Sequence, residues 1–154
     1  MRRATSRRLA LCAALAFGVC PLAAAPPAKQ EHFTGKVVPL AGLVEKIGSK
    51  LDADAAPHWL ALVTADGKVY PLIKDGGARM FFKDPALLNR PMRLTGRLLP
   101  GSQLLQVLDV HSIHKGELHE VYYWCDVCSI RRSEKNPCEC CGGPMELREV
   151  PVKK

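Results

Sequence analysis

The chain has 154 residues, 24% of them charged, and a formal net charge of +7. This length suits one modest domain with a small appendage. Basic runs after residue 25 are no longer than Arg131-Arg132, which argues against nucleic-acid binding, and no hydrolase, phosphate-loop or dinucleotide motif indicates an enzyme.

Residues 1–25 have the three parts of a secretory signal peptide. Four arginines stand in the first eight residues, the apolar run Leu9–Val19 follows, and Ala23–Ala25 supplies small residues before a cleavage site. Eleven apolar residues are too few to span a bilayer. We therefore expect cleavage, no membrane span in the mature chain, and export to the periplasm, the cell envelope or the medium. An uncleaved N-terminal anchor is the alternative. Removal of four arginines and no acid lowers the net charge from +7 to +3.

After a flexible N-terminus expected at 26–32, alternating apolar residues predict a β-rich domain. The predicted strands lie at 32–40, in two runs of 59–73 that flank Asp66-Gly67, at 91–99 and at 103–113. Asp66-Gly67 favours a type I′ hairpin turn. Pro71 cannot donate a ladder hydrogen bond, so its strand is expected at a sheet edge.

Two segments between these strands have helical features. Residues 41–51 carry apolar side chains at near-helical spacing, which Gly48 weakens. Residues 78–89 predict a short helix or two, with Pro85 starting the second.

The order of these elements resembles that of the OB-fold, a five-stranded Greek-key barrel with a helix between its third and fourth strands. The resemblance implies a mainly β fold over residues 33–115, with an SH3-like barrel or an open meander as alternatives. OB-like barrels that bind nucleic acid interleave aromatic and basic residues. The aromatic residues here suit a core instead, so nucleic acid is not the expected partner: Phe33, Trp59, Tyr70, Phe81 and Phe82.

Five cysteines lie within residues 125–141, and four of them form two CxxC pairs. Cys125 and Cys128 are followed after nine residues by Cys138 and Cys141, which is zinc-ribbon spacing. A pair separated by two residues can direct both sulfurs to one point if the backbone turns tightly, and Gly142-Gly143 would allow this turn. We expect a four-cysteine Zn²⁺ site in a β-hairpin module at 119–150, with residues 151–154 as a tail.

The alternative to metal binding is oxidation. In an oxidising compartment, five cysteines could form two disulfides and leave one free. Redox CxxC motifs usually stand at the start of a helix, whereas strand patterns flank both pairs here. Cys140 and His119 are accessory candidates, as an alternate ligand or, for Cys140, an oxidisable thiol. His111, His114 and His119 form a spaced run, but residues three apart on a strand face opposite sides, so a second metal site is not expected.

The segment 123–150 also resembles the bacterial heavy-metal-binding modules of copper-exporting ATPases and efflux adaptors. The matching residues are Tyr123, Cys125, Cys128, Arg131 or Arg132, Pro137, Cys138, Cys141-Gly142, Met145 and Leu147. Cys128 stands where that family has histidine, the family's Met-Pro pair around it is missing, and Gly143-Pro144 is inserted. The smaller number of His and Met ligands favours a closed zinc site over copper handling. The whole chain resembles small uncharacterised exported bacterial proteins with an OB-like domain.

The sequence therefore predicts an exported, non-catalytic binding or interaction protein with a structural zinc site. Its partner, a protein or a small ligand, is not identified by the sequence. Envelope metal handling of zinc or copper is the first alternative, and a thiol oxidoreductase is the second.

Overall fold

A computed structural model describes residues 29–153. The expected signal peptide, residues 26–28 of the expected flexible segment and Lys154 of the tail lie outside the described residues. In the described part, no helix is both long and apolar enough to cross a membrane.

The described chain is mainly β, as predicted. Its strands are β1 (Glu31–Pro39), β2 (Leu60–Thr64), β3 (Val69–Pro71), β4 (Pro91–Leu98), β5 (Leu105–His114), β6 (Glu117–Cys125), β7 (Ile130–Arg132) and β8 (Glu146–Pro151). Two short α-helices and two 3₁₀ turns interrupt them: α1 (Ala41–Glu45), η1 (Ala56–His58), α2 (Arg79–Lys83) and η2 (Pro85–Leu87). Glu31 and His32, placed in the expected flexible segment, belong to β1.

All eight strands join one antiparallel sheet, in the order β3-β2-β1-β4-β5-β6-β7, with β8 also paired to β6. The predicted five-stranded barrel is not closed, because this sheet is open. Among the described residues, Leu72, directly after β3, meets Leu105 of β5 in one isolated parallel bridge. β3 has three residues and ends at Pro71, which has no N–H to continue a ladder. The OB-fold resemblance stays a prediction.

The hairpin at Asp66-Gly67 was correctly predicted, but its turn type was not. A type I′ turn needs a positive φ at both central residues, and here Gly67 has one, of 80°, whereas Asp66 does not. Gly67 donates its N–H to the carbonyl of Thr64, and the Thr64 side chain hydrogen-bonds Asp66. The bond between Thr64 and Asp66 stabilises a loop that is longer than a two-residue type I′ turn. Of Asp66 and Gly67, only Gly67 has the left-handed conformation.

The two helical segments differ in how well they pack. Residues 78–89 form α2 and then η2, which starts at Pro85 as predicted. The predicted helix at 41–51 is shorter than expected, since α1 ends at Glu45 and Gly48 has a φ of 77°. α2 buries Met80 and Phe81, whereas α1 buries no residue.

The hydrophobic core lies between the curled sheet and α2. The inward residues of β4 alternate as predicted, with Met92 and Leu94 fully buried. Four of the five aromatic residues assigned to the core lie in it or pack against it, but Trp59 is 44% exposed, so its assignment was wrong. It follows η1 directly, where the chain turns into β2.

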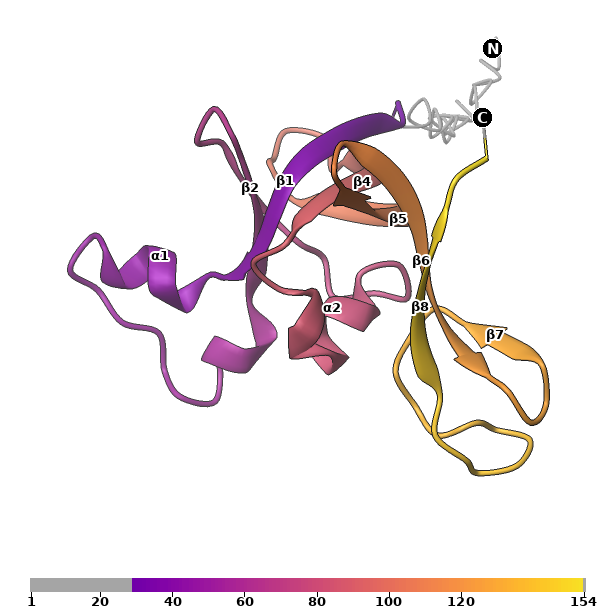
Figure 1. The fold of residues 1–154 in the computed structure, drawn as a ribbon. Coiled ribbons are helices and arrows are strands. Elements are labelled where there is room, and N and C mark those ends of the chain that lie inside the picture. Colours follow the sequence, from indigo (N-terminus) through magenta and orange to yellow (C-terminus); the bar gives the residue numbers. More distant parts are fainter. Residues whose placement is uncertain (1–28, 154) are drawn as a thin grey trace, which may run out of the picture.

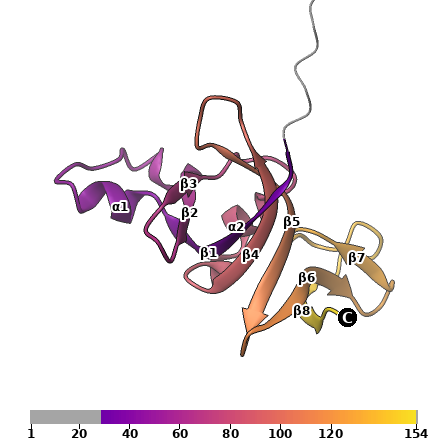
Figure 2. The same ribbon diagram turned by 90° about the horizontal axis from the view of Figure 1, so that it is seen from above.

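β6 joins the C-terminal module to this sheet. It pairs with β5 through its first residues and with β7 and β8 further along. Figures 1 and 2 show α1 at one end of the molecule and the β6–β7–β8 module at the other, with α2 between them. The module is therefore an extension of the sheet through one shared strand.

Candidate metal centre

The first CxxC pair forms a tight turn at the end of β6. Cys125 is the last residue of this strand, and β7 starts at Ile130. The turn closes by a 2.8 Å hydrogen bond from the N–H of Ser129 to the carbonyl oxygen of Cys125. Ser129 has a φ of 55°, a conformation that few residues other than glycine adopt. The strand direction thus reverses over the pair.

The second pair repeats this geometry in the connection between β7 and β8. Gly142 donates its N–H to the carbonyl of Cys138 over 2.7 Å, with a φ of 70°. The N–H of Cys138 in turn donates to the carbonyl of Gly143 over 2.8 Å. Of the two glycines predicted to allow the turn, Gly142 therefore has the positive φ.

The two turns bring four sulfurs together. The Sγ atoms of Cys125, Cys128, Cys138 and Cys141 all lie within 4.8 Å of one another, and those of Cys125 and Cys141 are 3.6 Å apart. A tetrahedral ion with metal–sulfur bonds of about 2.3 Å holds its sulfurs about 3.8 Å apart, so the spacing fits such an ion. A disulfide bond measures about 2.05 Å, and the five described cysteines are free.

The surroundings of the sulfurs are unequal. Cys125 and Cys138 are buried, whereas Cys141 is exposed. The backbone N–H groups of Cys141 and Cys140 point at the Cys138 sulfur and lower the pKa of that thiol to about 7. The pKa of the Cys128 thiol is raised instead, because the sulfurs of Cys140 and Cys141 lie next to it. A metal bound here would displace protons, and its affinity would fall with falling pH.

The two accessory candidates lie in different places. Cys140 is exposed, next to the four-sulfur group but outside it. His119 is six residues before Cys125 on β6, roughly 20 Å away along an extended strand. Its ring stacks edge-on against that of His114, with 4.7 Å between ring centroids. The structure therefore does not bring His119 to the sulfurs.

A buried hydrogen bond ties the module to the helical segment. The Tyr123 hydroxyl, two residues before Cys125, donates to the Asp84 carboxylate over 2.8 Å, and both residues are buried. Asp84 also accepts the N–H of Ala86, so it caps η2 as well. Burial alone would raise the pKa of Asp84. The Tyr123 hydroxyl, the Ala86 N–H and nearby Lys135 together lower this pKa by more than burial raises it, so the net shift is downward.

Surface ion pairs extend this attachment. The loop that leads to the second pair carries Glu134, which lies 3.5 Å from Arg79 and 3.3 Å from Lys83 of α2. Lys83 also donates to the side-chain oxygen of Asn136 over 2.6 Å. One CxxC pair thus follows a strand anchored by Tyr123, and the other follows a loop anchored on α2.

Aromatic and basic side chains form a layer on the module that the sequence reasoning missed. Tyr122 and Trp124 alternate along β6, with 6.5 Å between ring centroids. The guanidinium of Arg131 lies 4.2 Å from the Tyr122 ring, and that of Arg148 lies 5.3 Å from the Trp124 ring. The sequence prediction considered only the aromatic residues of the predicted barrel. The run Tyr122-Tyr123-Trp124 and the arginines that follow it in the chain were nevertheless visible in the sequence. Both arginines are paired with carboxylates, Glu120 and Asp126, so this layer stabilises the module's own strands.

Comparisons of the chain with protein-family models, curated proteins and solved structures found no match. The resemblance to heavy-metal-binding modules therefore stays a prediction. What the structure contributes is a cluster of four cysteines whose positions are compatible with metal binding.

Proposed function

We propose that this chain is an exported, non-catalytic binding protein whose β6–β7–β8 module is held in shape by one structural Zn²⁺ ion. The observation that carries the proposal is the convergence of Cys125, Cys128, Cys138 and Cys141. Four thiolates complete a tetrahedral shell and leave no open position for a substrate, which is the property that separates structural zinc sites from catalytic ones.

The donor set supports zinc as the ion. All four ligands are cysteines, and tetrahedral four-sulfur sites are typical of zinc or iron. Zinc has no redox chemistry, which suits a site on an exported chain. With four thiolates and one Zn²⁺ the site would carry a charge of −2. The mature chain that the sequence predicts has a net charge of +3 without the site, so it would then approach neutrality.

The geometry supports a structural role for the ion. The module has three strands, of which β7 has only three residues, and its buried residues include two of the proposed ligands, Cys125 and Cys138. Small modules of this kind have too little apolar core to fold alone and commonly depend on a metal for folding. The ion would fix the two turns, and with them the strand that carries Tyr123 to Asp84.

The oxidoreductase alternative lacks its usual setting. Redox CxxC pairs draw on the start of a helix, whereas strand β7 follows the first pair and strand β8 the second in the described chain. The metal-handling alternative has one supporting observation, because Cys141 is exposed beside the exposed Cys140. Metal exchange therefore belongs in the test.

Native mass spectrometry of the purified protein, with a count of free thiols, tests the zinc proposal. We expect one zinc ion per chain, retained in Cys140→Ser and lost in Cys141→Ser. These two variants make the same change at adjacent exposed cysteines, so they separate ligation from general thiol chemistry. A metal-free protein with four cysteines in disulfides would overturn the proposal. Zinc that moves within minutes to a micromolar chelator, from a module that stays folded, would favour metal handling.

The export proposal rests on the pattern of residues 1–25 and needs its own measurement. N-terminal sequencing of the chain recovered from the periplasm of an expressing bacterium should find a start between residues 22 and 28. Recovery of the uncleaved chain from the membrane fraction would support the N-terminal anchor instead.

A further inference from the structure

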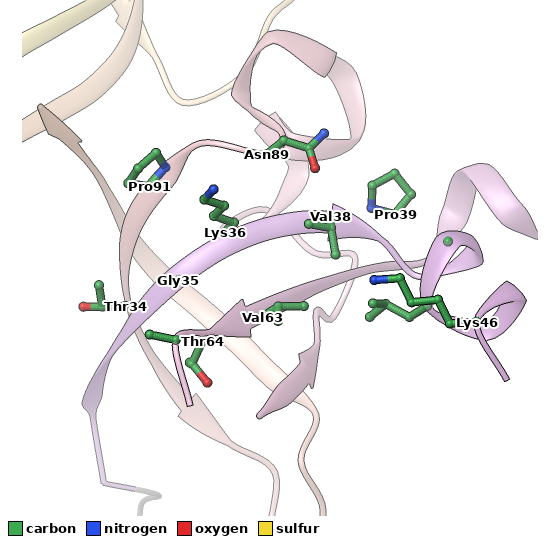
Figure 3. A pocket seen from close by; sticks show the side chains of 13 residues that line it. Thr34, Gly35, Lys36, Val38, Pro39, Lys46, Val63, Thr64, Asn89 and Pro91 are labelled. Carbon is green, nitrogen blue, oxygen red and sulfur yellow. The ribbon is translucent and has the colours of Figure 1, made fainter. Parts of the chain in front are cut away.

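A cavity of about 750 Å³ lies on the outward face of β1 and β2, away from the metal centre. Successive residues of a strand face opposite sides. Phe33 and Val37 of β1 face the core, whereas Thr34, Lys36 and Val38 line the cavity. α1 contributes a wall, and Figure 3 shows the side chain of Lys46, the residue after α1, beside this helix at one end of the strands. The volume is within the range of small-molecule sites, about 300–1,000 Å³.

The lining is suited to an apolar body. Val38 and Val63 come from neighbouring strands, Leu43 comes from α1, and Pro39 and Pro91 come from strand ends. Among the polar residues of the lining, Thr34, Thr64 and Asn89 offer uncharged hydrogen-bonding groups. Sites of this kind, mostly apolar with a few polar groups, orient a small ligand by its polar end.

The charge of the lining has one sign. Lys36 and Lys46 line the cavity, and no acidic residue does. In the part of the chain that the structure describes, neither ammonium group takes part in an ion pair, although lysines elsewhere do, such as Lys68 with Asp66. Two ammonium groups beside an apolar surface complement a ligand that joins an apolar body to an anionic group.

The packing of α1 provides a second observation. α1 and α2 each have five residues, a length that is unstable in water without tertiary contacts. α2 meets this need by burying Met80 and Phe81, whereas α1 buries no residue, and Ile47 beyond it is 80% exposed. A ligand in the cavity would contact Leu43 and supply apolar cover that α1 lacks.

We propose that the cavity between α1 and the outward face of β1 and β2 binds a small amphipathic carboxylate. The apolar body lies on Val38 and Val63, and the carboxylate pairs with an ammonium group of the lining, that of Lys36 or that of Lys46. This inference rests on the proposed function as a binding protein and names the class of its ligand. Ligand binding orders α1, because the helix then closes one side of an occupied site.

Calorimetric titration of the purified protein with dodecanoate, below its micelle concentration, tests the charge requirement. We expect saturable binding to one site, and at least about tenfold weaker binding in the double variant Lys36→Glu/Lys46→Glu, since the attraction of either lysine for the carboxylate becomes a repulsion. The control Lys115→Glu/Lys153→Glu makes the same change of charge at two exposed lysines outside the cavity, and should retain the wild-type affinity. Dodecylammonium binding as tight as that of dodecanoate would overturn the assignment of an anion.

Gly42 offers a test of the site itself. It lines the cavity, and a Cβ added there would meet no atom within 4 Å, so a side chain can start from this position without a clash at its Cβ. Gly42→Phe should abolish dodecanoate binding, whereas Gly42→Ala, the control for backbone effects, should keep it. Absence of binding to the wild type, or full binding by Gly42→Phe, would overturn the proposal. Counting bound zinc in the same samples distinguishes this failure from a failure of the zinc proposal.

Discussion

Ser129 and Gly142 are structurally equivalent. Each directly follows a CxxC pair, each has a positive φ, of 55° and 70°, and each donates its N–H to the carbonyl of the first cysteine in its pair. Both turns therefore use a residue in the left-handed conformation directly after the second cysteine. This conformation closes the turn that brings the two sulfurs of each pair toward one point. One turn has glycine at this position and the other has serine.

The first prediction concerns this position. Gly142→Val should destabilise the metal-bound protein by about 1–2 kcal/mol, because a side chain with a Cβ is disfavoured at positive φ, and it should also weaken metal binding. Urea unfolding and competition with a chelator measure the two effects. Gly101 has the same φ of 70° in the turn between β4 and β5. Gly101→Val should therefore lower stability without changing metal affinity, and equal losses of metal in both variants would contradict the prediction.

The second prediction concerns the bond between Tyr123 and Asp84. Tyr123→Phe removes the hydroxyl and leaves a buried carboxylate oxygen without its donor, which should cost about 1–3 kcal/mol of unfolding free energy. Tyr122→Phe is the matched control, because it makes the same change at the next residue, whose hydroxyl has no hydrogen bond among the described contacts. Urea unfolding of both variants measures the difference. Equal stabilities would show that the Asp84 contact contributes little.

The third prediction is a pH dependence set by Glu149. Burial raises the pKa of this carboxyl, but the Arg90 guanidinium at 2.6 Å and the His114 ring at 3.3 Å lower it, and the net shift is downward. A carboxyl with a lowered pKa stabilises the fold above its unfolded value of about 4.3, and this contribution is lost as the pH falls through the folded value. Glu149→Gln should therefore destabilise the protein at pH 7, and the difference from the wild type should shrink below pH 4.

Unfolding by urea at several pH values measures this effect. Glu146→Gln on the same strand is the control, since Glu146 is exposed and makes no ion pair among the described residues. The difference in unfolding free energy between the wild type and Glu146→Gln should not shrink below pH 4. A difference between wild type and Glu149→Gln that stays constant from pH 7 to pH 3 would be inconsistent with a lowered pKa.

The fourth prediction links the metal to α2. Removal of the metal by a chelator should speed amide hydrogen exchange in β7, in the loop 133–137 and in α2, because that loop contacts Arg79 and Lys83. β1 and β2 are separated from β6 in the sheet by β4 and β5 (Figure 2) and should exchange as before. Hydrogen exchange followed by mass spectrometry measures both regions. Faster exchange in β1 and β2 to the same degree would indicate global unfolding.

The sequence alone predicted the strands other than β7, the hairpin at Asp66-Gly67 and the two helical pieces at 78–89. These features depend on contacts between residues close in the chain, such as the alternation of Met92 and Leu94 and the fixed φ of Pro85. The cluster of four cysteine sulfurs was also predictable, because the spacing within a CxxC pair limits where its two sulfurs can point. That these sulfurs bind a metal ion stays a prediction.

Tertiary structure decided what depends on residues far apart. The sheet is open because β3 stops at Pro71 and Leu72, directly after it, meets β5 at a single bridge, a result that no local pattern encodes. The partnership of Tyr123 with Asp84 joins residues 39 positions apart, and the cavity beside Lys36 and Lys46 exists because α1 lies against β1 without burying a side chain. Local propensity fixes the conformation of short segments, but the contacts between segments depend on how their surfaces pack in three dimensions.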